Sequence, residues 1–179
     1  MTAEETMTPE DPEEVQEEEV LEPSEAPGPR AGPVGSALVI GAGIAGMQAA
    51  LDMADTNILV HVVEDQAGIG GWMSKLDKTF PTNDCAMCTL APKLVEVGRH
   101  PNIVLHTNAK VTELDGEAGE FTANIIERPR FIDPDKCTGC GFCGQYCPVE
   151  AISEYDEAVG DRPAVNVLFP QTVPLLFLS

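Results

Sequence analysis

Four cysteines in the last third of the chain have the side chain and the spacing needed to bind an iron–sulfur cluster. They follow the pattern C-x2-C-x2-C-x3-C, closed by a proline, and are Cys137, Cys140, Cys143 and Cys147. Each iron of a [4Fe–4S] cluster takes a thiolate, and two-residue gaps let three sulfurs converge from one tight turn. Gly139, Gly141 and Gly144 lie between the cysteines, where the backbone must curl closely without Cβ clashes. The stretch therefore predicts a [4Fe–4S] site.

A zinc site and a disulfide framework are the alternative uses of clustered cysteines. Zinc sites usually pair two separated C-x2-C units, and three cysteines at successive two-residue gaps before Cys-Pro are unusual for them. All six cysteines of the chain fall in C-x2-C clusters, which is typical of metal sites in a reducing compartment. The pattern favours iron–sulfur chemistry, and we expect a cytoplasmic protein.

A second group of residues has the pattern of a dinucleotide site. The run Gly41-Ala-Gly-Ile-Ala-Gly46 follows a short apolar stretch, and Glu64 ends the next apolar stretch. In such a run Gly41 permits a tight turn, Gly43 lets the backbone approach a pyrophosphate, and Gly46 allows close helix–strand packing. A helix N-terminus would bind the phosphates and Glu64 would accept hydrogen bonds from ribose hydroxyls. The alternative is a Rossmann-like unit that holds no ligand.

The loop after Glu64 favours FAD over NAD. Its sequence, Gly68-Ile-Gly70-Gly71, resembles the second signature of flavoproteins with two dinucleotide-binding domains, in which this loop runs along the FAD pyrophosphate. We therefore expect Gly70 and Gly71 to bind FAD together with the first glycine run and Glu64.

Hydrophobic periodicity predicts the elements that hold these residues. A β-α-β unit is expected first, and loops are expected from residue 65 to residue 89. A helix then begins at residue 91, with Pro92 in its first turn, and a hairpin with a longish loop surrounds Asp115-Gly116. The expected strands are 37–40, 58–63, 103–107, 111–114 and 121–126, and the expected helices are 47–55 and 91–99.

Composition divides the chain into three parts. Residues 1–35 are rich in Glu and Pro, and their first thirty positions hold eleven of the chain's thirty acidic residues, so a disordered acidic tail is expected. A Rossmann-like domain is expected over residues 36–130 and a ferredoxin-type segment over 131–179. Clustered Lys and Arg are absent, which argues against nucleic acid as a partner. No stretch approaches about 18 consecutive apolar residues, so no membrane span is expected.

Three phrases of the sequence together resemble the A-type iron–sulfur flavoproteins of CoB–CoM heterodisulfide reductase and their bacterial relatives. They are VIGAGIAGMQAALDMAD, GIGGWMSKLDKTFPTNDCAMCTLAPKLVEVGRHPNI and KCTGCGFCGQYCPV. The resemblance implies an α/β fold: a partial FAD-binding, thioredoxin-reductase-like Rossmann domain followed by part of a ferredoxin-like 4Fe-4S module. It also implies a flavin and iron–sulfur electron-transfer component of a reductase complex, in which the flavin is implicated in electron bifurcation.

The family continues beyond residue 179 with a second cysteine loop and the rest of the flavin domain. We therefore expect a truncated or split chain, whose partners are other reductase subunits or a polypeptide that supplies the missing parts. Either all four local cysteines bind one cluster, or a second chain completes the site. The apolar residues 165–178 are expected to be exposed. The alternative function is a non-catalytic cluster-binding fragment or adaptor.

The pair Cys85 and Cys88 has three open uses. They ligate a cluster, form a redox dithiol, or are two buried, inert thiols; the resemblance favours the first two uses. The neighbouring Asp84 would raise the pKa of a thiol beside it, which does not favour a reactive nucleophile. The histidines, His61, His100 and His106, show no ligand spacing, and no role is assigned to them.

Overall fold

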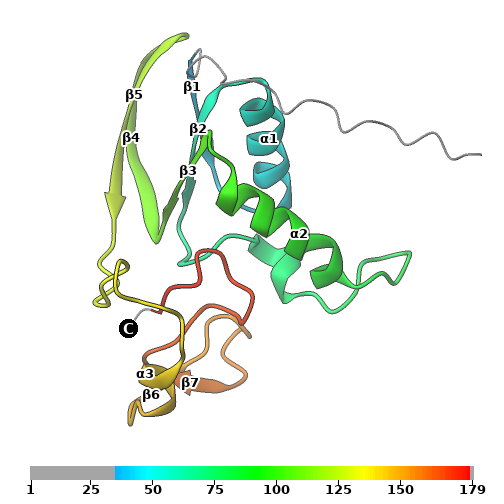
Figure 1. Ribbon diagram of the computed structural model, residues 1–179, viewed down its shortest axis with the longest axis vertical. Helices are drawn as coiled ribbons and strands as arrows, with labels where there is room; N and C mark the ends of the chain where they lie inside the picture. Colours follow the sequence, from blue (N-terminus) through cyan, green and yellow to red (C-terminus); the bar gives the residue numbers. More distant parts are fainter. Residues whose placement is uncertain (1–34, 178–179) are drawn as a thin grey trace, which may run out of the picture. The chain divides into compact units, whose positions relative to one another are not determined.

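The computed structural model describes residues 35–177 and is built around a parallel sheet (Figure 1). The strands β1 (Ser36–Ile40), β2 (Leu59–Glu64) and β3 (Ile103–Thr107) pair side by side in that order. The predicted α/β class and the predicted β-α-β unit are confirmed. The acidic tail expected over residues 1–35 lies outside the described residues, apart from Gly35.

Two helices cover one face of the sheet, because parallel strands must be joined by crossover connections (Figure 1). The helix α1 (Ile44–Asp55) follows the glycine run directly, and α2 (Ala86–Arg99) precedes β3. Between helices and sheet lies the hydrophobic core, in which Val60 and Val62 are fully buried. Within residues 35–177 neither helix, nor any other, has the length and apolar character needed to cross a bilayer.

The helix α2 begins five residues earlier than predicted. The Sγ atom of Cys85 accepts a hydrogen bond from the Cys88 N–H at 3.1 Å and so caps the helix. Pro92 therefore lies inside the helix and not in its first turn, as we expected from the preference of proline for that position. The helix continues through Pro92 because its buried side chains recur at helical spacing. They are Ala86, Leu90, Leu94 and Val97.

A hairpin lies along the opposite face of the sheet (Figure 1). Its strands, β4 (Ala109–Glu117) and β5 (Glu120–Glu127), are longer than predicted and the turn between them is correspondingly short. The expected turn at Asp115-Gly116 is wrong, because both residues belong to β4 and pair with β5. A short 3-10 helix, η1 (Gly71–Lys75), interrupts the region predicted to be only loop.

The cysteine-rich segment contains one short helix and two short strands. The helix α3 (Phe142–Gln145) lies within the cysteine loop, and β6 (Glu150–Ile152) pairs antiparallel with β7 (Asp161–Pro163). This arrangement agrees with a ferredoxin-type segment, whereas its predicted boundary at residues 130 and 131 stays a prediction.

The last described residues are mostly packed against the rest of the chain. The expected exposure of residues 165–178 is therefore wrong for most of this segment, although Leu175 is 46% exposed and residue 178 lies outside the described residues. Phe169 is 4% exposed, Thr172 is 3% exposed and Phe177 is 8% exposed. The Phe169 ring stacks on Tyr155, and the Val173 carbonyl accepts a hydrogen bond from the Ile69 N–H at 2.9 Å. Apolar residues that looked unpartnered in the sequence are thus part of the fold.

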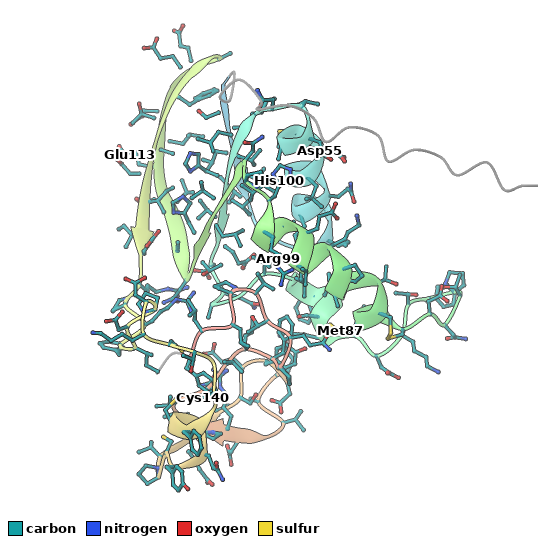
Figure 2. All side chains as sticks on the ribbon, viewed as in Figure 1. Asp55, Met87, Arg99, His100, Glu113 and Cys140 are labelled. Carbon is teal, nitrogen blue, oxygen red and sulfur yellow. A yellow bond between two sulfur atoms is a disulfide. The ribbon has the colours of Figure 1, made fainter. Side chains whose placement is uncertain are left out.

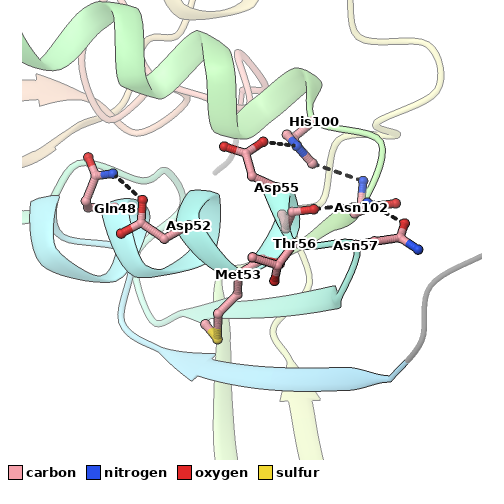
Figure 3. Close-up of polar contacts among 9 residues, drawn as sticks. Gln48, Asp52, Met53, Asp55, Thr56, Asn57, His100 and Asn102 are labelled. Carbon is pink, nitrogen blue, oxygen red and sulfur yellow. Dashed lines mark hydrogen bonds and ion pairs between the residues drawn. The ribbon is translucent and has the colours of Figure 1, made fainter. Parts of the chain in front are cut away.

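Polar side chains fasten the end of α1 to the connection between α2 and β3 (Figure 3). The Asn102 side chain donates to the Ala54 carbonyl at 3.1 Å, and His100 Nε2 lies 3.3 Å from Asp55 Oδ1. The Ala54 carbonyl, in the last turn of α1, also accepts a hydrogen bond from the Asn57 N–H at 3.0 Å, so Asn102 is its second donor. The Asn102 bond therefore holds the helix end beside the start of β3.

Replacing Asn102 tests this connection. Asn102→Ala should lower the free energy of unfolding by about 1 kcal/mol, because the Ala54 carbonyl loses one of its two donors. Asn102→Asp should destabilise more, since a carboxylate then faces a carbonyl at the negative end of a helix dipole. Urea denaturation of the three proteins measures the order, and an Asp variant as stable as the wild type would contradict it.

Candidate cofactor-binding sites

The glycine run forms a tight turn between β1 and α1. Gly41 has φ = 93°, a conformation that glycine adopts without strain, and its N–H donates to the Val63 carbonyl at 2.8 Å. A Cβ atom on Gly46 would lie 2.0 Å from the Gly41 carbonyl oxygen, so only glycine lets the helix pass this close to the turn. The local geometry is the one expected for G-x-G-x-x-G.

Glu64 folds back onto this turn from the end of β2. Its Oε2 accepts a hydrogen bond from the Ala42 N–H at 2.7 Å, and its Oε1 accepts one from the Gln66 N–H at 3.0 Å. A carboxylate has about four acceptor sites, so capacity remains for ribose hydroxyls. The structure therefore brings the predicted acidic residue to the predicted glycine turn.

The second glycine loop meets the first one. The Gly70 N–H donates to the Ala42 carbonyl at 2.8 Å, and a Cβ atom on Gly71 would lie 3.0 Å from Gly43 Cα. Both Gly70 and Gly71 have positive φ angles, 129° and 55°. Residues separated by a strand and a helix in the sequence thus form one surface at the start of α1.

An open groove of about 480 Å³ adjoins the turn on the hairpin side. Its lining includes Gly41 and Glu64 together with residues of β4. This volume falls within the range of small-ligand sites. A Cβ atom on Gly43 would meet no other protein atom within 4 Å, so this glycine is not needed for packing and leaves room for a ligand at the backbone.

The cysteine loop presents four free thiols around α3. Cys140 and Cys143 are exposed, whereas Cys137 and Cys147 are half-buried. Figure 2 shows Cys140 beside α3 and the two short strands. Gly139 and Gly141 have φ angles of 69° and 82°, so the loop uses left-handed backbone between its cysteines, as the sequence predicted.

Hydrogen bonds favour the thiolate form at two of these cysteines. Backbone bonding at Phe142, followed by the Thr138 side chain, lowers the pKa of Cys140 below that of an ordinary thiol. Backbone bonding at Val165 and Val149 lowers the pKa of Cys147. Thiolates are the ligands of iron–sulfur clusters, so the donor set fits such a group.

The thiols are not drawn together around one point. Among residues 35–177, no three His, Cys, Asp or Glu side chains are arranged to hold a metal ion. Cys147 has hydrogen-bonding partners in the backbone of Val165 and Ala164. Whether it shares a cluster with the other three cysteines stays a prediction.

Cys85 and Cys88 form a disulfide at the N-terminus of α2. Both residues are exposed and their sulfurs are bonded, so the alternative of two buried, inert thiols is wrong. A disulfide is what the oxidised form of a redox pair would contain, and it occupies both sulfurs that a cluster would need. Their use as ligands or as a redox pair stays a prediction.

Two histidines without a predicted role lie together on the sheet. His61 Nδ1 is 3.2 Å from His106 Nε2, and His106 Nδ1 is 2.8 Å from Glu127 Oε1. The rings belong to neighbouring parallel strands, and Glu127 belongs to β5. The strand positions were predictable, but the contact depends on the register between β2 and β3, for which the sequence has no local signal.

Two sequence families match parts of the chain. Residues 39–103 match the NAD(P)-binding Rossmann-like domain, and residues 130–153 match the 4Fe-4S binding domain. The first range contains both glycine loops and Glu64, and the second contains all four cysteines of the loop. The predictions of a dinucleotide-binding fold and of a [4Fe–4S] segment are confirmed.

Curated relatives extend this match to most of the chain. The second A-type iron-sulfur component of the CoB–CoM heterodisulfide reductase of Methanopyrus kandleri is 55% identical over 79% of this chain and 22% of its own length. The A component of the H2:CoB-CoM heterodisulfide,ferredoxin reductase of Methanothermobacter thermautotrophicus is 54% identical over 78% of this chain and 21% of its own. This chain thus spans about a fifth of the length of these relatives.

Solved structures resemble the chain more weakly. The L-proline dehydrogenase of P. horikoshii aligns with a TM-score of 0.43 and 20% identity, over 51% of this chain and 19% of that one. An FAD-dependent pyridine nucleotide-disulphide oxidoreductase from Desulfovibrio vulgaris aligns with a TM-score of 0.36 and 24% identity, over 51% and 20%.

Two glycine variants separate ligand contact from packing in the first loop. Gly43→Ala should lose the bound dinucleotide while changing the unfolding free energy by less than about 1 kcal/mol, because its Cβ meets no protein atom. Gly46→Ala should lose about 1–3 kcal/mol of stability, because its Cβ overlaps the Gly41 carbonyl. Chromatography of heat-released nucleotide and urea denaturation give the two readouts.

The matched control is Gly35→Ala, since Gly35 also has open space around its Cβ position and lies before β1. It should change neither readout. Full dinucleotide retention in Gly43→Ala would refute the predicted approach of a pyrophosphate to this residue.

Proposed function

We propose that this chain, a homologue of the A-type components of heterodisulfide reductases, transfers electrons between FAD and a [4Fe–4S] cluster within a larger reductase. The observation that carries the proposal is that one chain contains both a hydrogen-bonded G-x-G-x-x-G turn and a four-cysteine loop. Both lie in a sequence about 50% identical to curated proteins of that name.

FAD is the proposed dinucleotide. The choice is supported by the second glycine loop, whose sequence resembles that of two-domain flavoproteins and which contacts the first loop through Gly70 and Gly71. Amide groups of both loops and the start of α1 would bind the pyrophosphate, and Glu64 would bind the ribose. FAD would supply the ability to accept and donate electrons singly or in pairs.

The cluster would be held by Cys137, Cys140, Cys143 and Cys147, and it would supply one-electron transfer. The chain's own contribution is to provide thiolates and hydrogen bonds to them. The lowered pKa values of Cys140 and Cys147, caused by backbone hydrogen bonds, support this role. Such hydrogen bonds also tune the reduction potential of a cluster.

The assembly and its substrate belong to the same proposal. The relatives are named as subunits of heterodisulfide reductases, and this chain corresponds to about a fifth of each. We propose that further polypeptide sequence, in this chain or in a partner chain, completes the flavin pocket and binds the second cluster. The cysteine usage supports a reducing compartment, hence the cytoplasm.

A second candidate function is a cluster-binding adaptor without flavin chemistry. The observation that favours it is the openness of the nucleotide groove, whose described walls are only β1, β2 and β4 with their adjoining loops. In that case the glycine loops would be structural, and electrons would reach the cluster from a partner protein.

Counting cofactors distinguishes the two candidates. An anaerobic preparation should contain about four irons per chain, with absorbance near 400 nm that dithionite bleaches, and extractable FAD. Iron without flavin would support the adaptor and refute the flavin half of the proposal. Zinc in place of iron would refute both.

Cys85 and Cys88 are proposed as a redox pair that takes two electrons and two protons to become a dithiol. Their exposure, and the backbone hydrogen bond to Cys85 Sγ at the helix N-terminus, support this use. Cys85→Ser should therefore leave iron per chain unchanged, whereas the matched variant Cys143→Ser should lower it. Thiol titration of unreduced, denatured protein should show about two fewer thiols than after reduction.

Loss of iron in Cys85→Ser to the level of Cys143→Ser would show that the pair ligates a cluster. A thiol count that reduction does not change would show that the two sulfurs are not joined.

A further inference from the structure

We propose that residues 169–177, here called the clamp, position the cysteine loop against the nucleotide loops and shield its cluster from water. Thr172 and Val173 are assigned as positioning residues on the nucleotide side. On the cysteine side Phe177 is assigned as the cover, and Leu175, itself 46% exposed, as its neighbour against Gly139. This inference rests on the proposed function, because it concerns how the same two cofactor sites are held together.

On the nucleotide side the clamp contacts the second glycine loop. The Ile69 N–H donates to the Val173 carbonyl at 2.9 Å. A Cβ atom on Gly68 would lie 1.9 Å from Thr172 Oγ1, so the Thr172 side chain packs against Gly68 at a distance that only glycine allows. Ile69 is fully buried and Thr172 is 3% exposed, which makes this contact part of the core.

The clamp residue Val173 also contacts α2. A Cβ atom on Gly98 would lie 2.6 Å from Val173 Cγ1, a separation that real Cβ contacts essentially never show. Val173 therefore lies between the loop that carries Gly70 and the last turns of the helix. Gly98 itself belongs to neither candidate cofactor site, which makes it a useful position from which to disturb the clamp.

On the cysteine side the clamp covers the glycines that separate the ligands. A Cβ atom on Gly139 would lie 3.0 Å from Leu175 Cδ2, and one on Gly144 would lie 3.2 Å from Phe177 Cε1. Phe177 is 8% exposed although it lies near the end of the described residues. Its ring therefore packs over the turn that carries Cys143.

The cysteine segment needs this cover because it has no apolar core of its own. From residue 110 to residue 168, all of which are described, no hydrophobic side chain is buried. Its anchors are contacts with other parts of the chain, such as Tyr155 stacked on Phe169 and Lys75 Nζ at 2.7 Å from Glu157. The clamp supplies the two buried aromatic rings, Phe169 and Phe177.

The arrangement has a redox consequence. Solvent exposure and hydrogen bonds to sulfur set the potential of a cluster. Reduction adds a negative charge, and water stabilises the more charged form. Displacing the clamp should therefore raise the cluster's midpoint potential, even when the displacement begins at α2.

The test is Gly98→Ala in the full chain. Gly98 is the second-last residue of α2, where alanine is at least as favourable as glycine, so without the clamp this variant would be unchanged or more stable. With the clamp, the new Cβ must displace Val173, whose branched side chain is stiff at χ1. Hydrogen exchange should then increase at the Ile69 amide and across the cysteine loop but not in β2, and the midpoint potential should rise.

A second substitution makes the effect reversible. In Gly98→Ala/Val173→Ala the overlapping Cγ1 is absent and the nearest remaining clamp atom is Val173 Cβ, 3.9 Å away. Exchange and potential should return toward wild type in this double variant. Gly35→Ala, an open glycine remote from the clamp, is the control for a change of glycine to alanine.

The outcomes separate this inference from the proposed function. Hydrogen exchange needs no cofactor, so wild-type exchange of the cysteine loop in Gly98→Ala overturns the clamp whatever the protein binds. A double variant that is not restored also overturns it. Absence of iron or flavin from wild-type protein overturns the proposed function instead, and exchange still decides the clamp.

Discussion

The structure depends on the two backbone polar groups of one buried residue, Ala42. Its N–H donates to Glu64 and its carbonyl accepts from the Gly70 N–H, while the residue itself is fully buried. Three signals that are separate in the sequence thus meet at one residue. A buried amide or carbonyl without a partner costs about 1–3 kcal/mol, so moving any one of the three segments away from the others would be unfavourable. Helix, strand end and loop are therefore fixed together before any ligand binds.

The sequence predicted the local fold of this turn well because its signals are local. The turn at Gly41 needs positive φ, and Gly46 needs contact with a backbone oxygen; both requirements select glycine whatever surrounds them. The start of α2 was also predicted from a local signal, and that prediction was wrong. Cysteine is not a usual N-cap residue, and Pro92 imitates the first position of a helix. The stripe of buried residues that begins at Ala86 was the better guide.

Contacts between distant segments were not predictable from local patterns. The meeting of His61 and His106 depends on strand register, and the burial of Phe169 and Phe177 depends on where the chain returns. An apolar run near two prolines has the same composition whether it is exposed or packed into the fold. Whether such a run is buried depends on the surface against which it can pack. Here the absence of a side chain at Gly68, Gly98 and Gly139 leaves space for Thr172, Val173 and Leu175.

The two halves of the candidate electron path are therefore stabilised in different ways. The nucleotide half has a hydrophobic core, and its turn is closed by hydrogen bonds between its own segments. The cysteine half buries no apolar side chain from residue 110 to residue 168, and small modules of this kind usually need metal or a staple. Free energy of cluster binding is then also free energy of folding. A segment that joins Gly139 to Gly68 lets the stable half order the cysteine loop in advance, and it brings the two sites under one set of packing constraints.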